Sequence, residues 1–177
     1  MSSIRTIKKE ELPLLGKIDR KESIAQFYRI ENGRLTLYDE ALEVAGWEPD
    51  EIAHNAAAEV ACFERGGWFR VVFDEQLPVA VVVLDSVFVD IGMPALQLKF
   101  LHVSHAYRGR GLAGKLFRLA GEQARTMGAA ALYISATPTR NTVDFYLRLG
   151  CRLLERPDPE LYRLEPEDIH LYFPLGG

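Results

Sequence analysis

Runs of alternating apolar and polar residues near the amino terminus predict β-strands. Two such runs, at residues 24–30 and 34–38, lie on either side of Asn32-Gly33, and an Asn-Gly pair in this position is a strong signal for a tight β-hairpin. A short first strand at residues 3–7 precedes a mostly polar segment, residues 8–20, for which we expect a helix. The chain is therefore expected to begin with a strand, a helix and a hairpin.

The middle of the chain has the pattern of one helix followed by three strands. Pro49 opens a helical segment that ends near Glu64, where Gly66-Gly67 stops it. The next three segments are rich in β-branched and aromatic residues and are predicted as consecutive antiparallel strands, at residues 68–73, 79–84 and 96–103. The second of them is apolar at every position, as expected for a strand that is covered on both faces.

Residues 112–127 form the most clearly amphipathic segment. The charged side chains fall on one face of the predicted helix and the apolar ones on the other, namely Leu112, Leu116, Leu119, Ala120, Ala124 and Met127. The remaining pattern predicts a strand at 130–136, a helix at 141–149 and strands at 151–154 and 169–175, with a proline-containing loop before the last strand. The sum is an α/β fold with a mixed sheet and helices on both faces, antiparallel early and with a strand-helix-strand crossover late.

Length and composition are typical of a single globular domain over residues 1–177. The net charge of -4 argues against a nucleic-acid partner. No apolar run approaches the roughly 20 residues that cross a bilayer, and no secretory signal opens the chain, so we expect a cytoplasmic protein without a membrane partner. Cys62 and Cys151 lack metal-ligand spacing, as do His54 and His105, so we expect free thiols and no metal site.

A glycine- and arginine-rich turn, residues 108–114, lies between the strand at 96–103 and the amphipathic helix. Glycine has no Cβ and allows several backbone N–H groups to converge on one point. The first N–H groups of the following helix have no partner within the helix and lie at the positive end of its dipole. With the charges of Arg108 and Arg110 beside them, these groups predict an anion site suited to a pyrophosphate.

Two widespread phosphate loops do not fit this turn. The nucleoside-triphosphate loop requires Lys-Ser or Lys-Thr after its glycines, and neither pair follows here. The dinucleotide fingerprint matches only at Gly109, Gly111 and Gly114, and it should follow the first strand of a repeated βαβ unit, whereas three consecutive strands precede this turn. A plain bend with solvated arginines, and a site for a different phosphate ligand, stay open as alternatives.

Residues 108–113, Arg-Gly-Arg-Gly-Leu-Ala, resemble the Gln/Arg-x-x-Gly-x-Gly/Ala signature of the GNAT superfamily of acyl-CoA N-acetyltransferases. Residues 141–150 resemble that family's later Asn…Phe-Tyr…Gly-Phe helix, with Cys151 where the family usually has Phe. The resemblance, strongest over 96–151, implies a mixed, mostly antiparallel sheet of six to seven strands with helices on both faces. It also implies that the strand at 96–103 splays away from the one at 130–136, and that residues 1–67 shape the acceptor site.

The resemblance further implies that acetyl coenzyme A is the acyl donor. Its pantetheine arm would pair with backbone groups at Leu101, His102 and Val103 and approach Asn141, while Tyr146 would lie near the thiol. The residues implied for the pyrophosphate and its surroundings are those of the turn: Arg108, Gly109, Arg110, Gly111, Leu112, Ala113 and Gly114.

The chemistry of the transfer requires a neutral amine, and deprotonating a lysine-like amine at pH 7 costs about 4.6 kcal/mol. Many members of the family carry a Glu on the splayed strand, but residues 96–103 contain no carboxylate, and Gln97 cannot accept a proton. His102 has an intrinsic pKa of about 6.5 and is the candidate base, with a purely structural strand histidine as the competing interpretation. Asp85 and Asp90, near the end of the preceding strand, are weaker candidates.

The departing thiolate benefits from a proton donor, and Tyr146 occupies the family position for that role. Core packing is the competing interpretation for Tyr146, because it also fits the buried stripe of its helix. Trp47, Trp68 and Tyr28 are candidates for lining the acceptor pocket, although buried aromatic residues belong more often to the core.

Two functional hypotheses follow from these residues. The first is transfer of an acetyl group to a primary amine of a small molecule or peptide. The second is a non-catalytic acyl-CoA sensor or interaction module on the same fold, which the missing carboxylate at 96–103 keeps open. The identity of the acceptor and the presence of a homodimer do not follow from the sequence.

Overall fold

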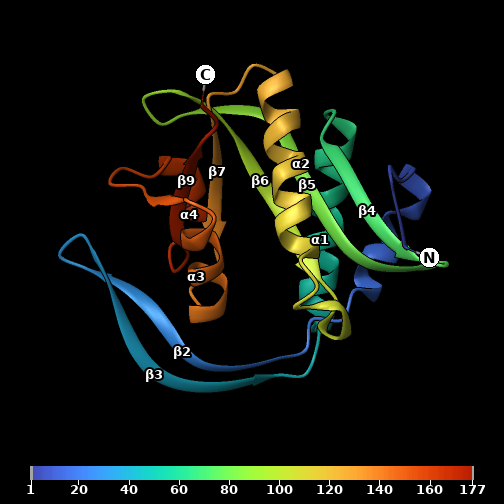
Figure 1. The fold of residues 1–177 in the computed structure, drawn as a ribbon, viewed down its shortest axis with the longest axis horizontal. Helices are drawn as coiled ribbons and strands as arrows, with labels where there is room; N and C mark the ends of the chain where they lie inside the picture. Colours follow the sequence, from blue (N-terminus) through green and yellow to red (C-terminus); the bar gives the residue numbers. More distant parts are fainter. Residues whose placement is uncertain (1, 177) are drawn as a thin grey trace. The chain divides into compact units, whose positions relative to one another are not determined.

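The computed structural model describes residues 2–176, and its helices and strands follow the expected order (Figure 1). The strands are β1 (Ser2–Arg5), β2 (Glu22–Glu31), β3 (Arg34–Val44), β4 (Trp68–Asp74), β5 (Leu77–Asp90), β6 (Pro94–Val103), β7 (Ala131–Ala136), β8 (Arg152–Leu153) and β9 (Ile169–Pro174). The helices are the 3-10 helices η1 (Lys9–Lys17) and η2 (His105–Tyr107) and the α-helices α1 (Pro49–Glu64), α2 (Leu112–Thr126), α3 (Arg140–Arg148) and α4 (Pro159–Leu164).

Seven strands form a mixed sheet in the order β1-β4-β5-β6-β7-β9-β8. The pairs β1–β4, β4–β5, β7–β9 and β8–β9 are antiparallel, whereas β6 and β7, which α2 connects, are parallel. The β6–β7 ladder joins Ala95–Gln97 to Ala131–Tyr133, although β6 continues to Val103 and β7 to Ala136. The predicted fold class, a mostly antiparallel mixed sheet with a late crossover, is confirmed.

Contacts within the chain divide it into two compact units, and β5, β6 and α2 contribute residues to both. The first unit contains the residues up to Glu22, Val44–Ser86 and Leu98–Glu122. The second contains Ser23–Glu43, Val87–Gln97 and the residues from Gln123 onward.

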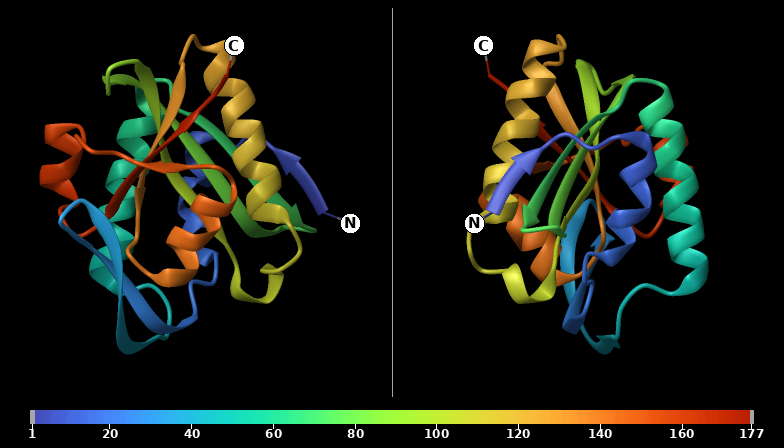
Figure 2. Two further views of the ribbon diagram at one scale, coloured as in Figure 1. Left: turned by 60° about the vertical axis from the view of Figure 1, so that its left-hand side comes forward. Right: turned by 90° about the vertical axis from the view of Figure 1, so that its right-hand side faces the viewer.

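In the first unit, η1 and α1 lie on one face of the strands and the start of α2 lies on the other (Figure 2). Apolar side chains of η1, α1, β4 and β5 form its main core, which includes Leu12, Leu15, Ile18, Cys62, Phe69, Val71, Phe73, Val81 and Val83. Complete burial of one such Leu or Phe side chain contributes about 1.5–3 kcal/mol, so this core holds η1 and α1 against the sheet.

In the second unit, β7 pairs with β9 along its whole length, and Tyr133 of β7 lies with its hydroxyl 2.7 Å from Nδ1 of the buried His170. The β2–β3 hairpin contacts the start of α3, because the Tyr28 backbone N–H donates to the Pro138 carbonyl at 2.7 Å. The hairpin turn has positive φ angles at both Asn32 (50°) and Gly33 (74°). These angles are the ones that a type I′ turn requires, as the Asn-Gly pair predicted.

Two helices differ from expectation. The segment predicted as a helix over residues 8–20 forms the 3-10 helix η1, because Pro13 inside it lacks the N–H that an α-helical hydrogen bond needs. Conversely, the segment predicted as a proline-containing loop holds the short helix α4. Asp158 caps α4 by accepting hydrogen bonds from the backbone N–H groups of Glu160 (3.1 Å) and Leu161 (3.0 Å), with Pro159 in the first turn.

Gly67 connects α1 to β4 at a point where the backbone has no room for a side chain. A Cβ at position 67 would lie 2.4 Å from Cys62 Sγ and 2.7 Å from the Cys62 carbonyl oxygen, which accepts a hydrogen bond from the Gly67 N–H at 2.8 Å. We predict that Gly67→Ala lowers the free energy of unfolding by about 1–3 kcal/mol in urea titrations. Gly16→Ala is the control, because its Cβ would meet Ile52 Cγ2 at an ordinary 3.8 Å; equal stability of the two variants would contradict the prediction.

Candidate active site

The glycine turn after β6 is exposed, and two of its glycines have a left-handed backbone conformation. Gly109 and Gly111 have φ angles of 74° and 76°, in the left-handed region that residues with a Cβ rarely adopt. A Cβ at either position would meet none of the described atoms within 4 Å, so backbone conformation, and not lack of space, requires glycine here. Helix α2 begins at Leu112, so the first N–H groups of the helix belong to this turn.

Two arginines are fixed to the same turn by hydrogen bonds to backbone carbonyls. Arg108 Nε donates to the Val103 carbonyl at 3.1 Å, and an Arg110 terminal nitrogen donates to the Ala106 carbonyl at 3.0 Å. The Arg110 guanidinium also lies 4.9 Å from the centre of the Tyr107 ring. Each guanidinium has five N–H donors, so one such bond orients the group and leaves capacity for an anion. The arrangement supplies oriented positive charge beside the first amides of α2.

His102 lies on β6 two residues before a buried corner at Ser104, whose backbone N–H donates to the Val79 carbonyl at 2.8 Å. The ring is half-buried and packs edge-on against Trp47, with ring centres 5.2 Å apart. Burial, followed by the positive charges of Arg20 and Arg108, lowers the pKa of His102 from 6.5 to about 4. The imidazole is therefore neutral at pH 7 and is a weaker base than its intrinsic pKa suggests.

The two aspartates considered as bases have different surroundings. Asp85 is buried, accepts hydrogen bonds from Arg65 at 2.8 and 2.5 Å, and lies 3.7 Å from Lys99 Nζ. Such a paired carboxylate serves the structure of the first unit, since removing one partner of a buried ion pair is strongly destabilising. Asp90 is exposed and accepts a hydrogen bond from the Gly92 N–H at 2.8 Å in the turn after β5.

Helix α3, in the second unit, carries the other two predicted site residues. Thr139 caps it by accepting a hydrogen bond from the Thr142 N–H at 3.3 Å, and Asn141 is exposed in its first turn. Tyr146 is buried, with 7% of its surface exposed, and its ring lies 5.1 Å from that of Phe145. Burial, followed by the nearby Cys151, raises the pKa of Tyr146 well above its usual value of 10. Its hydroxyl therefore stays protonated at physiological pH.

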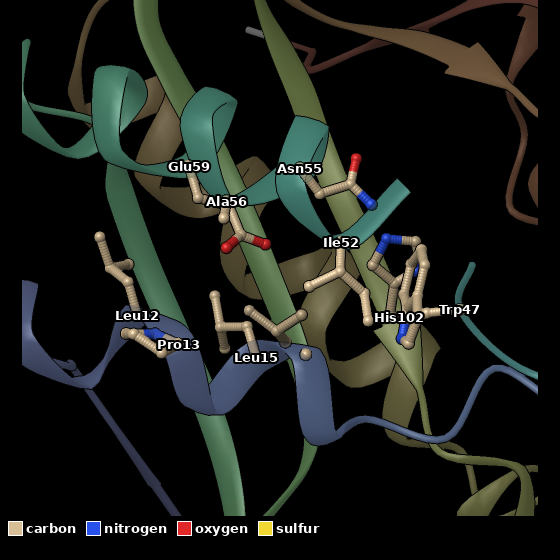
Figure 3. A pocket seen from close by; sticks show the side chains of 11 residues that line it. Leu12, Pro13, Leu15, Trp47, Ile52, Asn55, Ala56, Glu59 and His102 are labelled. Atoms are coloured by element: carbon tan, nitrogen blue, oxygen red, sulfur yellow. The ribbon is translucent and has the colours of Figure 1, made fainter. Parts of the chain in front are cut away.

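A cavity of about 130 Å³ in the first unit holds a residue that the sequence did not single out (Figure 3). We call it the Glu59 pocket; its lining residues are Leu12, Pro13, Leu15, Gly16, Trp47, Ile52, Asn55, Ala56, Glu59, Val81 and His102. The side chain of Glu59 is half-buried, and burial raises its pKa from 4.5 to about 7. The sequence held a signal for it, since Glu59 lies at helical spacing from Ile52, Ala56 and Cys62 on the apolar side of α1.

The structure thus places the predicted residues in two groups. Leu101, His102, Val103 and the turn lie together in the first unit, linked by the bond from Arg108 to Val103, whereas Asn141 and Tyr146 lie on α3 in the second unit. Of the three aromatic residues considered for the acceptor pocket, only Trp47 lines the Glu59 pocket. Tyr28 instead donates to Asp144 at 2.7 Å.

Within residues 2–176, no cluster of His, Cys, Asp and Glu side chains has the geometry of a metal site. Over the same residues, no helix is long and apolar enough to cross a membrane.

An exposed glycine turn lies between a strand of the sheet and an amphipathic helix, on a mixed sheet in which β6 and β7 are parallel. The family model described as the acetyltransferase (GNAT) family matches residues 26–151, which is more than half of the chain. The protein therefore belongs to the GNAT acetyltransferase family, whose members act on amine acceptors.

Solved structures agree with this assignment at the level of the fold. A nourseothricin acetyltransferase has a TM-score of 0.74 at 19% identity, with 99% of each chain covered. A candidate streptothricin acetyltransferase from Bacillus anthracis, solved with acetyl coenzyme A, has a TM-score of 0.69 at 15% identity over 97% of this chain and 96% of its own. The PaiA N-acetyltransferase of Thermoplasma acidophilum, solved with coenzyme A, has a TM-score of 0.63 at 13% identity over 98% and 99%. No curated protein sequence matches the chain.

Proposed function

We propose that the protein transfers an acetyl group from acetyl coenzyme A to a primary amine by direct attack of the amine on the thioester. The observation that carries the proposal is the exposed turn before α2, with left-handed Gly109 and Gly111 and with Arg108 and Arg110 fixed beside it. Hydrogen bonds to charged groups contribute about 1.5–3 kcal/mol each, so a few of these donors suffice to hold a pyrophosphate.

In this proposal each part of the cofactor has its own set of residues. The pyrophosphate is assigned to the turn, whose members are Arg108, Gly109, Arg110, Gly111, Leu112, Ala113 and Gly114. The pantetheine arm is assigned to backbone groups at Leu101, His102 and Val103 and to the exposed amide of Asn141. Backbone N–H and C=O groups suit this role because the arm contains amides that pair as a strand would.

The shifted pKa values of His102 and Tyr146 give these two side chains different roles in the reaction. Protonating a group of pKa about 4 at pH 7 costs about 4 kcal/mol, so His102 serves as an acceptor of hydrogen bonds and not as the final proton carrier. The raised pKa of Tyr146 likewise makes full proton transfer to a thiolate of pKa about 8.5 unfavourable. A hydrogen bond from its hydroxyl to the departing sulfur stabilises the charge that develops there. The new C–N bond forms, the C–S bond breaks, and the amine loses its proton through solvent.

Arg108→Glu tests the cofactor side of the proposal. We predict at least a tenfold rise in the dissociation constant of acetyl coenzyme A by calorimetry, because a charge that donates to the pyrophosphate is replaced by one that repels it. Arg156→Glu is the matched control, since Arg156 lies exposed in the loop before α4 and undergoes the same charge change. An unchanged dissociation constant for Arg108→Glu would remove the turn from the cofactor site.

A second measurement distinguishes the enzyme from an acyl-CoA sensor on the same fold, a hypothesis that the lack of a carboxylate on β6 keeps open. The protein is incubated with acetyl coenzyme A and a panel of primary amines, and free thiol is followed with a chromogenic disulfide. Amine-dependent thiol release is expected of the enzyme, whereas tight cofactor binding without release would indicate a sensor.

A further inference from the structure

The Glu59 pocket lies between η1 and α1, against strands β5 and β6. Its walls are mostly apolar, with Leu12 and Leu15 from η1 and Ile52 and Ala56 from α1. Figure 3 shows Glu59 and His102 lining it from different walls, with Leu15 and Ile52 between them. One side is open to solvent, because Ile52 and Ala56 are exposed, so a small ligand can enter.

Glu59 is the one carboxylate of this lining, and no hydrogen bond or ion pair joins it to another residue within 2–176. Two other carboxylates of α1 have partners: Glu51 bonds to Arg20, and Glu64 forms an ion pair with Lys9 at 2.5 Å. A half-buried carboxylate without a partner is costly in its ionised form, and burial alone accounts for its raised pKa of about 7. A cation bound in the pocket would supply the missing partner.

We propose that the Glu59 pocket is the acceptor site of this enzyme, and that Glu59 binds the far ammonium of an acceptor that carries two amino groups on a short alkyl chain. The inference rests on the proposed function for the reacting end of that acceptor. In this inference the segment that contains η1 and α1 recognises the acceptor.

Three features of the pocket favour this class of acceptor. Leu15, Ile52 and Val81 offer methyl and methylene contacts to an alkyl chain and no hydrogen bonds from their side chains to a sugar or a peptide. Glu59 at one wall selects a positive charge over a neutral or negative group. His102 at the other wall adjoins Val103, where the proposal above places the pantetheine arm, so the second amino group would lie on the cofactor side.

The size of the cavity limits the length of the chain. An apolar cavity of about 150 Å³ holds benzene, which has six non-hydrogen atoms, and the Glu59 pocket measures about 130 Å³. Diaminobutane has the same number of non-hydrogen atoms. Pentylamine matches it in length and atom count but ends in a methyl group, so the two amines differ only in the charge that Glu59 would recognise.

The groups around Glu59 define the expected pH dependence. Those that titrate are His102 on β6, which is neutral above a pKa of about 4, and Cys62 on α1, whose pKa burial raises to about 11; the lining residues of η1 and β5 do not titrate. Between pH 6 and 8 only Glu59 changes its charge in this group. Raising the pH through 7 ionises Glu59 and strengthens binding of a diammonium ion. Pentylamine has no second ammonium group, so the ionisation of Glu59 does not strengthen its binding.

The test compares wild type, Glu59→Gln and the control Glu10→Gln, which changes an exposed carboxylate on η1 that lies outside the pocket. Glu59→Gln removes an unpaired half-buried charge and is expected to fold. In wild type at pH 8 we expect KM for diaminobutane about tenfold lower than for pentylamine, and Glu59→Gln should abolish that difference while leaving KM for pentylamine within about twofold. The preference should shrink at pH 6 in wild type, and Glu10→Gln should keep it.

Calorimetry with diaminobutane in the absence of acetyl coenzyme A separates this inference from the proposed function. Binding by wild type that Glu59→Gln loses supports the Glu59 pocket, even if no thiol is released and acetyl transfer fails. Thiol release with amines but with equal KM values for diaminobutane and pentylamine, or with a preference that Glu59→Gln keeps, overturns the inference and leaves the acetyltransferase intact. Failure of wild type to bind diaminobutane at pH 8 overturns it as well.

Discussion

Replacing Tyr146 by Phe is expected to lower kcat by about 10²–10³-fold and to leave the dissociation constant of acetyl coenzyme A within about twofold. The hydroxyl is removed and the buried ring stays in place, so the packing of α3 is kept. Because burial holds the pKa of Tyr146 above its usual value, the hydroxyl is a hydrogen-bond donor throughout the working pH range. Its loss should therefore affect the step in which charge develops on sulfur, and not the binding of the cofactor.

The matched control is Tyr162→Phe, which removes a hydroxyl from an exposed tyrosine of α4. We expect wild-type kcat for this variant, measured by thiol release under saturating acetyl coenzyme A. Wild-type kcat for Tyr146→Phe as well would show that Tyr146 acts only as a core residue, the competing interpretation that its position on the buried stripe of α3 suggests.

The second large effect is expected for Gly111→Val, which should raise the dissociation constant of acetyl coenzyme A by at least about tenfold. The left-handed conformation at Gly111, with φ of 76°, costs a residue with a Cβ about 1–2 kcal/mol, and a β-branched side chain suits it least. If the turn relaxes to avoid this strain, the first amides of α2 lose their alignment, and each hydrogen bond to a phosphate is worth about 1.5–3 kcal/mol.

Gly92→Val is the control for the effect of backbone strain alone. Gly92 has φ of 86° in the turn between β5 and β6, and a Cβ there would also meet none of the described atoms within 4 Å. Both variants should lose similar stability in thermal unfolding, and only Gly111→Val should lose cofactor affinity by calorimetry. Equal affinities of the two variants would mean that the turn does not contact the cofactor.

Features set by local backbone geometry were predictable from the sequence. Asn32-Gly33 predicts a hairpin because both residues tolerate positive φ, and both adopt it. The glycines after the strand at 96–103 predict a turn before α2, and Gly109 and Gly111 of that turn have positive φ as well. The apolar stripe that begins at Leu112 likewise predicts α2 to within one residue at its carboxyl end.

Features set by tertiary surroundings were not predictable in the same way. The intrinsic pKa of His102 favours a base, but its packing against Trp47 and its burial lower that pKa to about 4. In the sequence, Glu59 has the pattern of an ordinary carboxylate on a helix. In the structure, η1 lies across from it, and partial burial raises its pKa. Helix α4 had a local signal in Asp158-Pro159, a cap followed by a favourable first residue, that the neighbouring prolines outweighed.

Transfer of an acetyl group from coenzyme A to an amine is the activity that we propose for this chain. The most direct test incubates the wild-type protein with acetyl coenzyme A and a primary amine such as diaminobutane, and measures the N-acetylated amine by mass spectrometry alongside free coenzyme A. We expect both products to form in equal amounts and Gly111→Val to reduce both together. Cofactor binding without any N-acetylated product across a broad panel of primary amines would contradict it.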